Sequence, residues 1–322
     1  MSNHAFISDA KDMSGTILND DCFLFTKGSE DRSYTVFDRY LELISPQKCI
    51  MLDSRLRYET LSANEMEKYN RIDSLISQKG IQNIKTVSVE TPYISNSLLS
   101  EDISAANTIS MDISSMNFWD ISDLICFLLT MKRIKRLNIF YTEPDLYHYE
   151  NDDIIQYDHN RHPVSINYIR GYYSTKTADE EILVSMIGFQ KHVNKLLKDL
   201  FEVSQYYSIN GFPSFYPKAK DISQTNNDDF LSEILPANRY SAEAINPFIT
   251  YNTLLEIKKA SHNSYMNICP LCSKPMAVGA CLYAIKNPTN TRIIYPYAAT
   301  VATKTDGIGR TFCYSIFQDF LC

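Results

Sequence analysis

Short apolar segments alternate with longer amphipathic segments throughout the chain. The short segments are rich in β-branched and aromatic residues, which is typical of buried strands, and the longer ones repeat their apolar positions at helical spacing. Strands separated by helices of this length predict βαβ units in a mostly parallel sheet. In the first half, strands are expected at residues 22–25, 48–52, 84–89, 108–113 and 136–141, and helices at 34–44, 64–78 and 118–131.

The alternation restarts near residue 181 and predicts a second unit of the same kind. Strands are expected there at 182–187, 206–210, 240–245, 264–268 and 292–297, with an edge strand at 311–316, and helices at 190–201, 227–235, 248–260 and 274–285. The fold class expected is therefore α/β, with two tandem Rossmann-like units at residues 15–144 and 181–322. Residues 145–180 are polar and rich in tyrosine, and we expect them to form an insertion or linker.

The two halves also resemble each other in detail. In the closing part of each half, a strand leads through a short polar turn into an apolar helix, and a further strand ends at Tyr141 or Tyr295. Pro144 and Pro296 lie just beyond those tyrosines. We interpret this as an internal repeat of one α/β unit, against the alternative that any two βαβ segments look alike.

Composition limits the classes of partner. The chain has 322 residues, of which 44% are hydrophobic, which is enough for two cores, and its net charge of −7 disfavours duplex nucleic acid as a partner. The basic run at 132–136 is better explained by cations at a helix end.

The chain has no apolar stretch of about 18 residues and no apolar segment near its start, so we expect no membrane span and a cytoplasmic location. Frequent isoleucine, asparagine and lysine favour a bacterial source.

The candidate ligand-binding residues follow from the rule that ligands of open parallel sheets bind beyond the carboxyl ends of the strands, where helices begin. They lie in the turns after the expected strands and are Gly28, Ser29, Ser114, Ser115, Asn117, Gly188, Ser273, Lys274 and Tyr295. Several have an ordinary structural explanation, because Ser115 or Asn117, and likewise Ser273 before Pro275, are good helix N-caps. The chain has neither a G-x-G-x-x-G fingerprint nor a Walker A loop, so no dinucleotide or other cofactor is expected.

Two cysteines have the spacing of a redox pair or of half a zinc site. Cys269 and Cys272 form C-x-x-C before an expected helix, where a thiol pKa can be lowered. The sequence has no second C-x-x-C and no matching histidine pair, so we favour coincidental spacing and expect no metal site.

Two turns resemble those of CRISPR-associated Rossmann-fold (CARF) sensors. In that family a strand runs into a turn with an acidic residue, a hydroxyl residue two positions on and a base four positions after that, or into Gly-Thr-Lys-Pro-Met. The similar segments here are 112–118 and 272–276, although Phe118 replaces the base and no glycine pair precedes Lys274. The resemblance implies a sensor of cyclic oligoadenylates, held between two Rossmann units, in prokaryotic antiviral defence.

Three functions follow as hypotheses. The first is a module that binds a nucleotide or a related anionic small molecule in a cleft between the units. The second is a hydrolase or transferase for a nucleotide or sugar phosphate, with Glu143 or Asp53 as acid or base and residues 145–178 as a lid. The third is an adaptor subunit that uses the tyrosines of the same segment to bind a protein partner, at residues 147, 149, 157, 168, 172 and 173.

Overall fold

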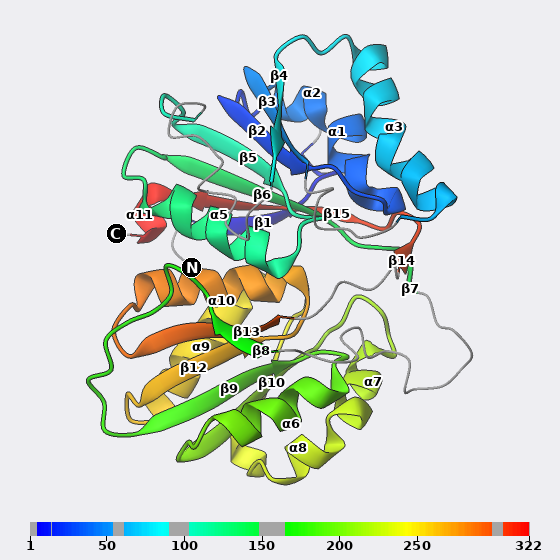
Figure 1. Ribbon diagram of the computed structural model, residues 1–322. Helices are drawn as coiled ribbons and strands as arrows, with labels where there is room; N and C mark the ends of the chain where they lie inside the picture. The colour runs from blue at the N-terminus through cyan, green and yellow to red at the C-terminus, as the bar shows by residue number, and fades with distance from the viewer. Residues whose placement is uncertain are drawn as a thin grey trace. The chain divides into compact units, whose positions relative to one another are not determined.

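The computed structural model describes residues 5–13, 15–53, 61–89, 103–147, 165–297 and 305–321. The chain forms two compact units, which are labelled element by element in Figure 1. The first unit combines Met1–His148 with Ala302–Cys322, and the second is Tyr149–Val301. Within the described residues, no helix combines the length and the apolar composition needed to cross a membrane.

The first unit is built on a sheet with the order β1-β15-β6-β5-β2-β3-β4. Its parallel strands are β2 (Cys22–Thr26), β3 (Lys48–Asp53), β4 (Ile84–Ser88), β5 (Thr108–Asp112) and β6 (Arg136–Thr142). Beyond β6 lie β15 (Thr311–Phe317) and β1 (Ala5–Asp9), each antiparallel to its neighbour.

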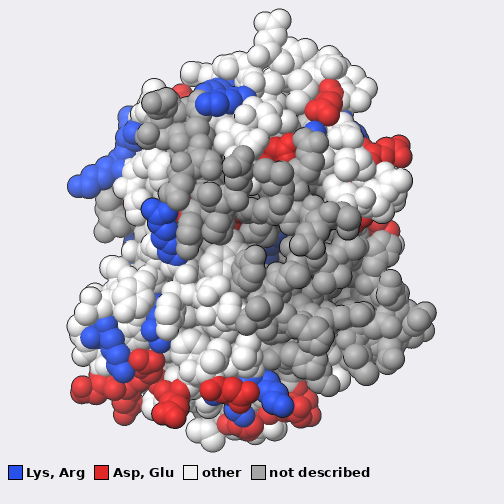
Figure 2. All heavy atoms as spheres, in the orientation of Figure 1, with Lys and Arg blue, Asp and Glu red and all other residues white. Residues whose placement is uncertain are grey.

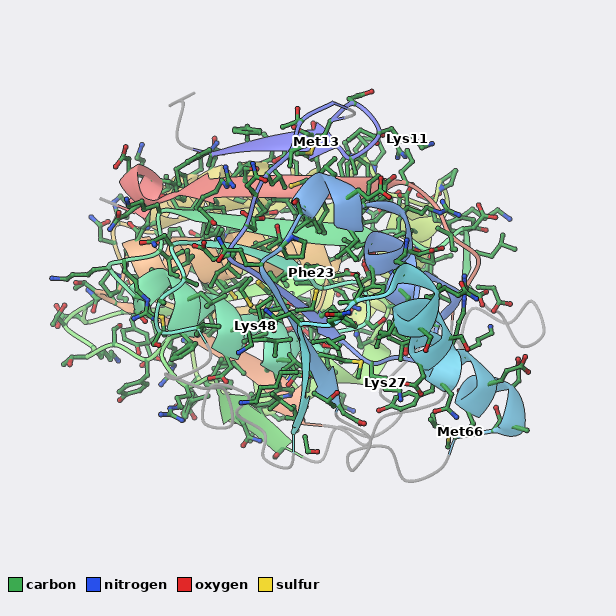
Figure 3. All side chains as sticks on the ribbon, turned by 90° about the horizontal axis from the view of Figure 1, so that it is seen from above. Lys11, Met13, Phe23, Lys27, Lys48 and Met66 are labelled. Atoms are coloured by element: carbon green, nitrogen blue, oxygen red, sulfur yellow. The ribbon has the colours of Figure 1, made fainter. Side chains whose placement is uncertain are left out.

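Helices cover both faces of this sheet. One core contains Phe23, Phe25 and Met51 of the sheet together with Phe37 and Ile72 from the helices. Figure 3 labels Phe23 among the side chains of this unit. These helices are α1 (Thr35–Arg39), α2 (Leu41–Ile44) and α3 (Ala63–Lys79), and α5 (Phe118–Thr130) covers the opposite face (Figure 1).

The second unit has a sheet with the order β11-β10-β9-β12-β13-β8. The strands β9 (Glu181–Ile187), β10 (Gln205–Gly211), β11 (Arg239–Ala242), β12 (Tyr265–Pro270) and β13 (Thr291–Tyr297) are parallel, and β8 (Ser165–Tyr168) is antiparallel to β13. One face packs on α9 (Pro247–Ala260) and α10 (Lys274–Lys286). The other face packs on α6 (Lys191–Leu200) and α8 (Asp228–Ser232), which follows α7 (Ala219–Asn226).

The two units share one strand order. If the parallel strands of each unit are counted along the chain, both sheets have the order 3-2-1-4-5, which is that of a Rossmann-like unit. The expected α/β fold with two tandem Rossmann-like units and mostly parallel sheets is therefore confirmed. The order also defines a switch point in each unit, between β2 and β5 and between β9 and β12, where ligands of such sheets bind.

The C-terminal strand was placed in the wrong sheet by the sequence pattern. Residues 311–316 were expected at the edge of the second sheet, whereas β15 lies inside the first, with Thr311 opposite Thr142 and Phe317 opposite Arg136. The run is buried along nearly all of its length, as expected for a strand whose two faces are both covered. An apolar run predicts a strand, but it carries no information about which strands it will pair with.

The expected insertion at 145–180 contains regular structure in its described parts. β7 (Leu146–Tyr147) pairs with β14 (Thr305–Asp306) in the first unit, and β8 forms the edge of the second sheet. Tyr172, expected at an exposed surface, is buried, whereas Tyr168 and Tyr173 are exposed. The histidines at 148, 159 and 162 lie outside the described residues.

Candidate functional site

The switch point of the first unit brings together two of the expected residues. A Cβ placed on Gly28, just after β2, would lie 2.8 Å from both Cβ and Oγ of Ser115, in the turn after β5. It would also lie 2.7 Å from Oγ of Ser33. Real side chains do not tolerate such contacts, so the close approach of the two turns depends on glycine at position 28.

Two hydroxyl groups at this point are buried and have no hydrogen-bond partner in the part of the chain that the structure describes. Thr26, the last residue of β2, is 3% exposed, and its Oγ1 has no hydrogen-bond partner among the described residues. The same holds for Oγ of Ser115. A buried polar group without a partner costs about 1–3 kcal/mol, so such groups are rare unless a ligand or water satisfies them.

A buried lysine follows the same strand. Lys27 is 5% exposed, and its Nζ lies 3.3 Å from Oδ2 of Asp73 and 4.9 Å from the centre of the Tyr69 ring. Figure 3 places Lys27 at one end of the sheet, beside helix α3. The Asp73 side chain is 61% exposed, so water weakens its attraction for the lysine. The end of β2 therefore carries a buried positive charge that Asp73 offsets only in part.

A second buried cation, Arg32, is used inside the protein. Its Nε donates to Glu30, and its Nη1 donates to the carbonyl oxygen of Thr142 at 2.9 Å and to the hydroxyl of Tyr141 at 3.2 Å. Arg32 therefore connects the turn after β2 to the end of β6.

The hydroxyl of Tyr34 holds the turn in place. It accepts the backbone N–H of Gly28 at 3.0 Å, and it lies 2.9 Å from the Gly28 carbonyl oxygen and 2.8 Å from that of Tyr69. Burial raises the pKa of the Tyr34 hydroxyl above its ordinary value, so it stays protonated. The Gly28 N–H is thus used within the protein.

Asp53 lies beside this turn. It ends β3, and the neighbouring strands are aligned with Thr26 opposite Leu52, so that the N–H of Lys27 donates to the carbonyl oxygen of Leu52. The hydroxyl of Tyr69 donates to Oδ1 of Asp53. Lys27 and Asp53 are thus a cation and an anion at adjacent strand ends, both in contact with one tyrosine.

Ser114 and Asn117 have structural roles. The Ser114 hydroxyl donates to Asp112 and accepts the N–H of Thr142 at 2.9 Å. Asn117 is the N-cap of α5 and accepts the N–H of Asp120 at 2.9 Å. For Asn117, the capping explanation considered from the sequence is the one that the structure shows.

Glu143 lies at the far side of the same sheet end. Its Oε1 accepts from the backbone N–H of Arg310 at 3.1 Å and from Nε of Arg310 at 2.9 Å, and its Oε2 is buried with no partner among the described residues. The order β6-β5-β2-β3 separates Glu143 from Asp53 by three strand spacings, or about 14 Å. The two carboxylates are therefore too far apart to share a proton as one catalytic pair.

The second unit has an equivalent close approach at its switch point. A Cβ on Gly188, after β9, would lie 1.8 Å from the carbonyl oxygen of Leu271, after β12. The amides of Asn226 and Asn227 donate to the carbonyl oxygens of Phe189 and Gly188, each at 2.9 Å. Buried asparagines thus fix this turn.

The other expected residues of the second unit have mixed roles. Ser273 is the N-cap of α10 and donates to the carbonyl oxygen of Ala244 at 2.6 Å, so it is satisfied within the protein. Lys274, the first residue of α10, is half-buried. Tyr295 packs beside Cys269 and Leu271, and burial raises the pKa of its hydroxyl. Ser29, in the first unit, is also half-buried.

The two cysteines of the C-x-x-C segment are free thiols. Burial raises the pKa of both Cys269 and Cys272, so neither is a thiolate at neutral pH, which is the reactive form. Among the described residues no group of three or more histidine, cysteine, aspartate or glutamate side chains is arranged to hold a metal ion.

The basic run at 132–136 takes part in structural contacts. Arg136 pairs with the buried Asp20 at 2.8 Å, and Arg133 donates to the carbonyl oxygen of Ile103 at 2.8 Å. On the face shown in Figure 2, the described surface carries both acidic and basic side chains. These contacts explain the arginines of the run without a nucleic-acid ligand.

A pocket of the first unit lies at the opposite end of the sheet. It is lined by residues near the start of β3 and the end of α3, among them Leu41, Ser45, Cys49 and Asn83. Ligands of parallel sheets bind at the carboxyl ends of the strands, so this pocket is a weaker candidate than the switch point.

The strand-end rule places Thr26 and Lys27 in a candidate turn, residues 26–29, but neither residue was among the expected ligand-binding residues. Tyr69 was not identified at all. Lys27 could have been identified from its position between an apolar strand and a glycine, because a lysine at such a position is close to a ligand-binding turn. Tyr69 carried no comparable signal, because an aromatic residue on the apolar face of a helix is ordinary core.

Comparisons with known proteins do not assign the chain to a family. No family model matches the sequence, and no curated protein matches it. A solved structure that is similar is a universal stress protein from Archaeoglobus fulgidus DSM 4304, with a TM-score of 0.25, 8% sequence identity, and coverage of 88% of this chain and 98% of that chain. A TM-score this low carries no argument about function.

Proposed function

We propose that the first unit binds a small anionic ligand of the nucleotide type at the carboxyl ends of β2 and β5. The observation that carries the proposal is the buried Lys27, which lies next to a glycine-dependent close approach of two turns. There the hydroxyls of Thr26 and Ser115 have no hydrogen-bond partner within the described part of the chain. A phosphate group is a suitable ligand, because it accepts from both hydroxyls and offsets the buried charge.

The position in the fold supports the same ligand class. The two turns meet at the switch point of a 3-2-1-4-5 sheet, and α5 begins close by, with its N-terminal dipole favouring negative charge. A cation, hydroxyl donors and a helix N-terminus all select for an anion.

The resemblance to CARF sensors extends the proposal to a role in signal sensing for prokaryotic antiviral defence. Supporting this, the two similar segments occupy equivalent positions, since 112–118 leads from the fourth parallel strand of the first unit into α5, and 272–276 leads from the fourth strand of the second unit into α10. Cyclic oligonucleotides therefore belong among the ligands to be tested.

The alternative of an enzyme has less support. Glu143 is hydrogen-bonded to Arg310, and Asp53 is hydrogen-bonded to Tyr69. The two carboxylates also lie at the ends of strands that are separated by three strand-to-strand spacings. A binding module needs only the cation, the hydroxyls and the close approach of the turns, so we favour it.

A titration of the purified chain with nucleotides and cyclic oligonucleotides tests the proposal. A ligand present at about 100 times its dissociation constant stabilises the folded state by roughly 2.7 kcal/mol, which raises the melting temperature measurably. Lys27→Met keeps the length of the side chain and removes its charge, and we expect it to weaken binding about 10-fold or more.

Lys48→Met is the matched control for this experiment. Lys48 begins the neighbouring strand β3, where it pairs with Cys22 at the opposite end of the same sheet from Lys27. Figure 3 labels both lysines. The control variant should bind as the unchanged chain does. Equal affinity of the chain and of Lys27→Met for every ligand that binds would contradict the proposal.

A further inference from the structure

The pocket at the amino ends of the strands of the first sheet has a volume of about 470 Å³. Pockets that hold small molecules typically have volumes of about 300–1,000 Å³, so this one has room for a small organic ligand. It lies between the residues that end and follow α2 and the loop that joins α3 to β4 (Figure 1). The turns of the proposed anion site are at the other end of the same sheet, so the pocket is a separate feature of the unit.

Hydrogen bonds join the two walls of this pocket. The side-chain amide of Asn83 donates to the carbonyl oxygen of Gln47 at 2.6 Å, and the carbonyl oxygen of Asn83 accepts the N–H of Cys49 at 2.9 Å. The N–H of Gln47 in turn donates to the carbonyl oxygen of Asp20 at 3.0 Å. Because these bonds fix both walls, the pocket is formed before a ligand binds, and little further ordering opposes binding.

The buried part of the lining is apolar and uncharged. Leu41 and Cys49 are buried in one hydrophobic core, and Ile81 packs against the same core. Burial raises the pKa of the Cys49 thiol to about 11, so the thiol is neutral at pH 7. This part of the pocket suits the methylene groups of a ligand.

The outer part of the pocket is negative. Glu42 contributes an exposed carboxylate, and the described residues that line the pocket include no lysine, arginine or histidine. The 17-residue helix α3 also ends here, at Gly80. The last carbonyl oxygens of a helix have no donor within the helix, and its C-terminus carries about half a negative elementary charge.

The two lysines that adjoin the lining residues in the sequence do not cancel this charge. Lys79 is used elsewhere, because its Nζ donates to the carbonyl oxygen of Asp38 at 2.6 Å and lies 3.7 Å from the Asp38 carboxylate. Lys48 precedes Cys49 in β3, and successive side chains of a strand point to opposite faces of the sheet. The Lys48 side chain therefore lies on the other face from Cys49.

This combination selects one kind of ligand. An ammonium group offers a positive charge and three donors, which suit a carboxylate and the carbonyl oxygens at a helix end. An anion would be repelled by both. A calcium ion takes six to eight oxygen ligands, and it would leave the apolar part of the pocket uncovered.

We infer that this pocket binds an aliphatic amine, with its ammonium group held by Glu42 and the end of α3 and its carbon chain over Leu41 and Ile81. The inference goes beyond the proposed function and does not depend on it, because the two sites lie at opposite ends of the sheet and select opposite charges. The amine can be a free metabolite or the side chain of a lysine.

NMR titration of the full, isotope-labelled chain tests the inference. The probes are n-butylamine for a free amine and Nα-acetyllysine amide for a lysine side chain, and n-butanol is the matched uncharged control. At least one amine should shift the backbone N–H signals of residues 41–49 and 80–83. The alcohol should bind about fivefold more weakly or not at all, since it lacks the charge.

Glu42→Gln should weaken binding of the amine about threefold to fivefold, the effect of losing one exposed ion pair, and should leave binding of the alcohol unchanged. Glu67→Gln is the matched control, since Glu67 is an exposed glutamate of the same helix α3, about 20 Å from its C-terminal end at 1.5 Å per residue. It should leave binding unchanged. The substitution at Glu42 changes an exposed side chain, so we expect it to fold as the unchanged chain does.

Three results would overturn the inference. They are the absence of binding at millimolar amine, signal shifts spread over the acidic surface instead of gathered at the pocket, and equal binding of n-butylamine and n-butanol. All three are read on the unchanged chain and need no variant. The anion site is tested with nucleotides and Lys27→Met, so either proposal can fail without the other.

Discussion

Gly28 lies so close to Ser115 that a methyl group on its α-carbon would come within 2.8 Å of the serine Cβ. The contact joins the turns after the first and fourth parallel strands of the unit, which are distant in the sequence. It also places Ser115 beside the residue that directly follows Lys27 in the chain. The relation matters because it makes the geometry of the candidate site depend on a single missing side chain.

Gly28→Ala should therefore disturb both stability and ligand binding. The added methyl group must displace Ser115, and overpacking of this kind costs about 1–3 kcal/mol. Urea unfolding of the variant measures the loss, and titration with the ligand of the unchanged chain measures the effect on the site.

Ser115→Gly in the Gly28→Ala background removes the atoms that clash and should recover part of the lost stability. The recovery is partial because Oγ of Ser33 would also lie 2.7 Å from the new methyl group. If the double variant is no more stable than Gly28→Ala, the contact with Ser115 is not the cause of the loss.

Asp73→Asn should strengthen binding of an anion. Asp73 is the ion-pair partner of Lys27, and its removal leaves the lysine charge to the ligand. The gain should be small, about twofold to fivefold, because the side chain is 61% exposed and its charge is screened by water. Titrations at low and high salt check this, and weaker binding by the variant would show that Asp73 helps to hold the ligand.

A buried network at the other end of the first sheet should dominate its stability. Asp20 is fully buried and pairs with Arg136, and it also accepts hydrogen bonds from Ser110 and Asn138. Asp20→Asn leaves the arginine without its counter-charge, and breaking a buried pair in this way costs about 3–5 kcal/mol. Asp38→Asn, at a partly exposed pair, should cost less than about 1 kcal/mol in the same unfolding experiment.

The ion pair of Asp31 and Lys68 should make the free energy of unfolding depend on pH in the acidic range. Burial alone would raise the pKa of Asp31, but hydrogen bonds from Lys68 and from the N–H of Gly307 outweigh it, and the pKa is lowered overall. A carboxyl with a lowered pKa in the folded state stabilises the fold above its unfolded pKa, near 3.9, and this contribution is lost as the pH falls through the folded pKa.

Unfolding measured between about pH 2 and pH 7 tests this, with Asp31→Asn as the comparison. The variant should be less stable than the unchanged chain at pH 7, and the two should converge as the pH falls below the folded pKa. Parallel curves over the whole range would show that the pair contributes no pH-dependent stability.

The contrast between Gly28 and Lys27 shows which features the sequence alone could predict. Apolar runs such as 22–25 and 108–113 predict strands because burial on both faces requires continuous apolar side chains. The turns that follow predict Gly28 and Ser115 as site residues, because topology alone places ligands there. The burial of Lys27 depends on Tyr69 and Asp73, which lie more than forty residues further along the chain and reach the lysine only through the packing of α3.

The pairing of β15 was beyond the sequence pattern for a similar reason. A strand that is buried on both faces reads the same in either sheet, and only its register with β6 decides between them. Ser273 and Asn117 show a different ambiguity, because the same residue types can cap a helix or donate a hydrogen bond to a ligand. In the structure both residues are helix N-caps.

Lys274→Ala distinguishes the two switch points of the chain. Lys274 is half-buried at the first position of α10, whereas Lys27 is almost fully buried. Water screens an exposed charge, so a partly exposed lysine attracts a bound anion less strongly than a buried lysine does. Lys274→Ala should therefore weaken binding less than Lys27→Met does. Lys286→Ala, at the last position of the same helix, controls for the loss of a lysine from α10. If Lys274→Ala weakens binding more than Lys27→Met, the principal anion site is the turn after β12 in the second unit.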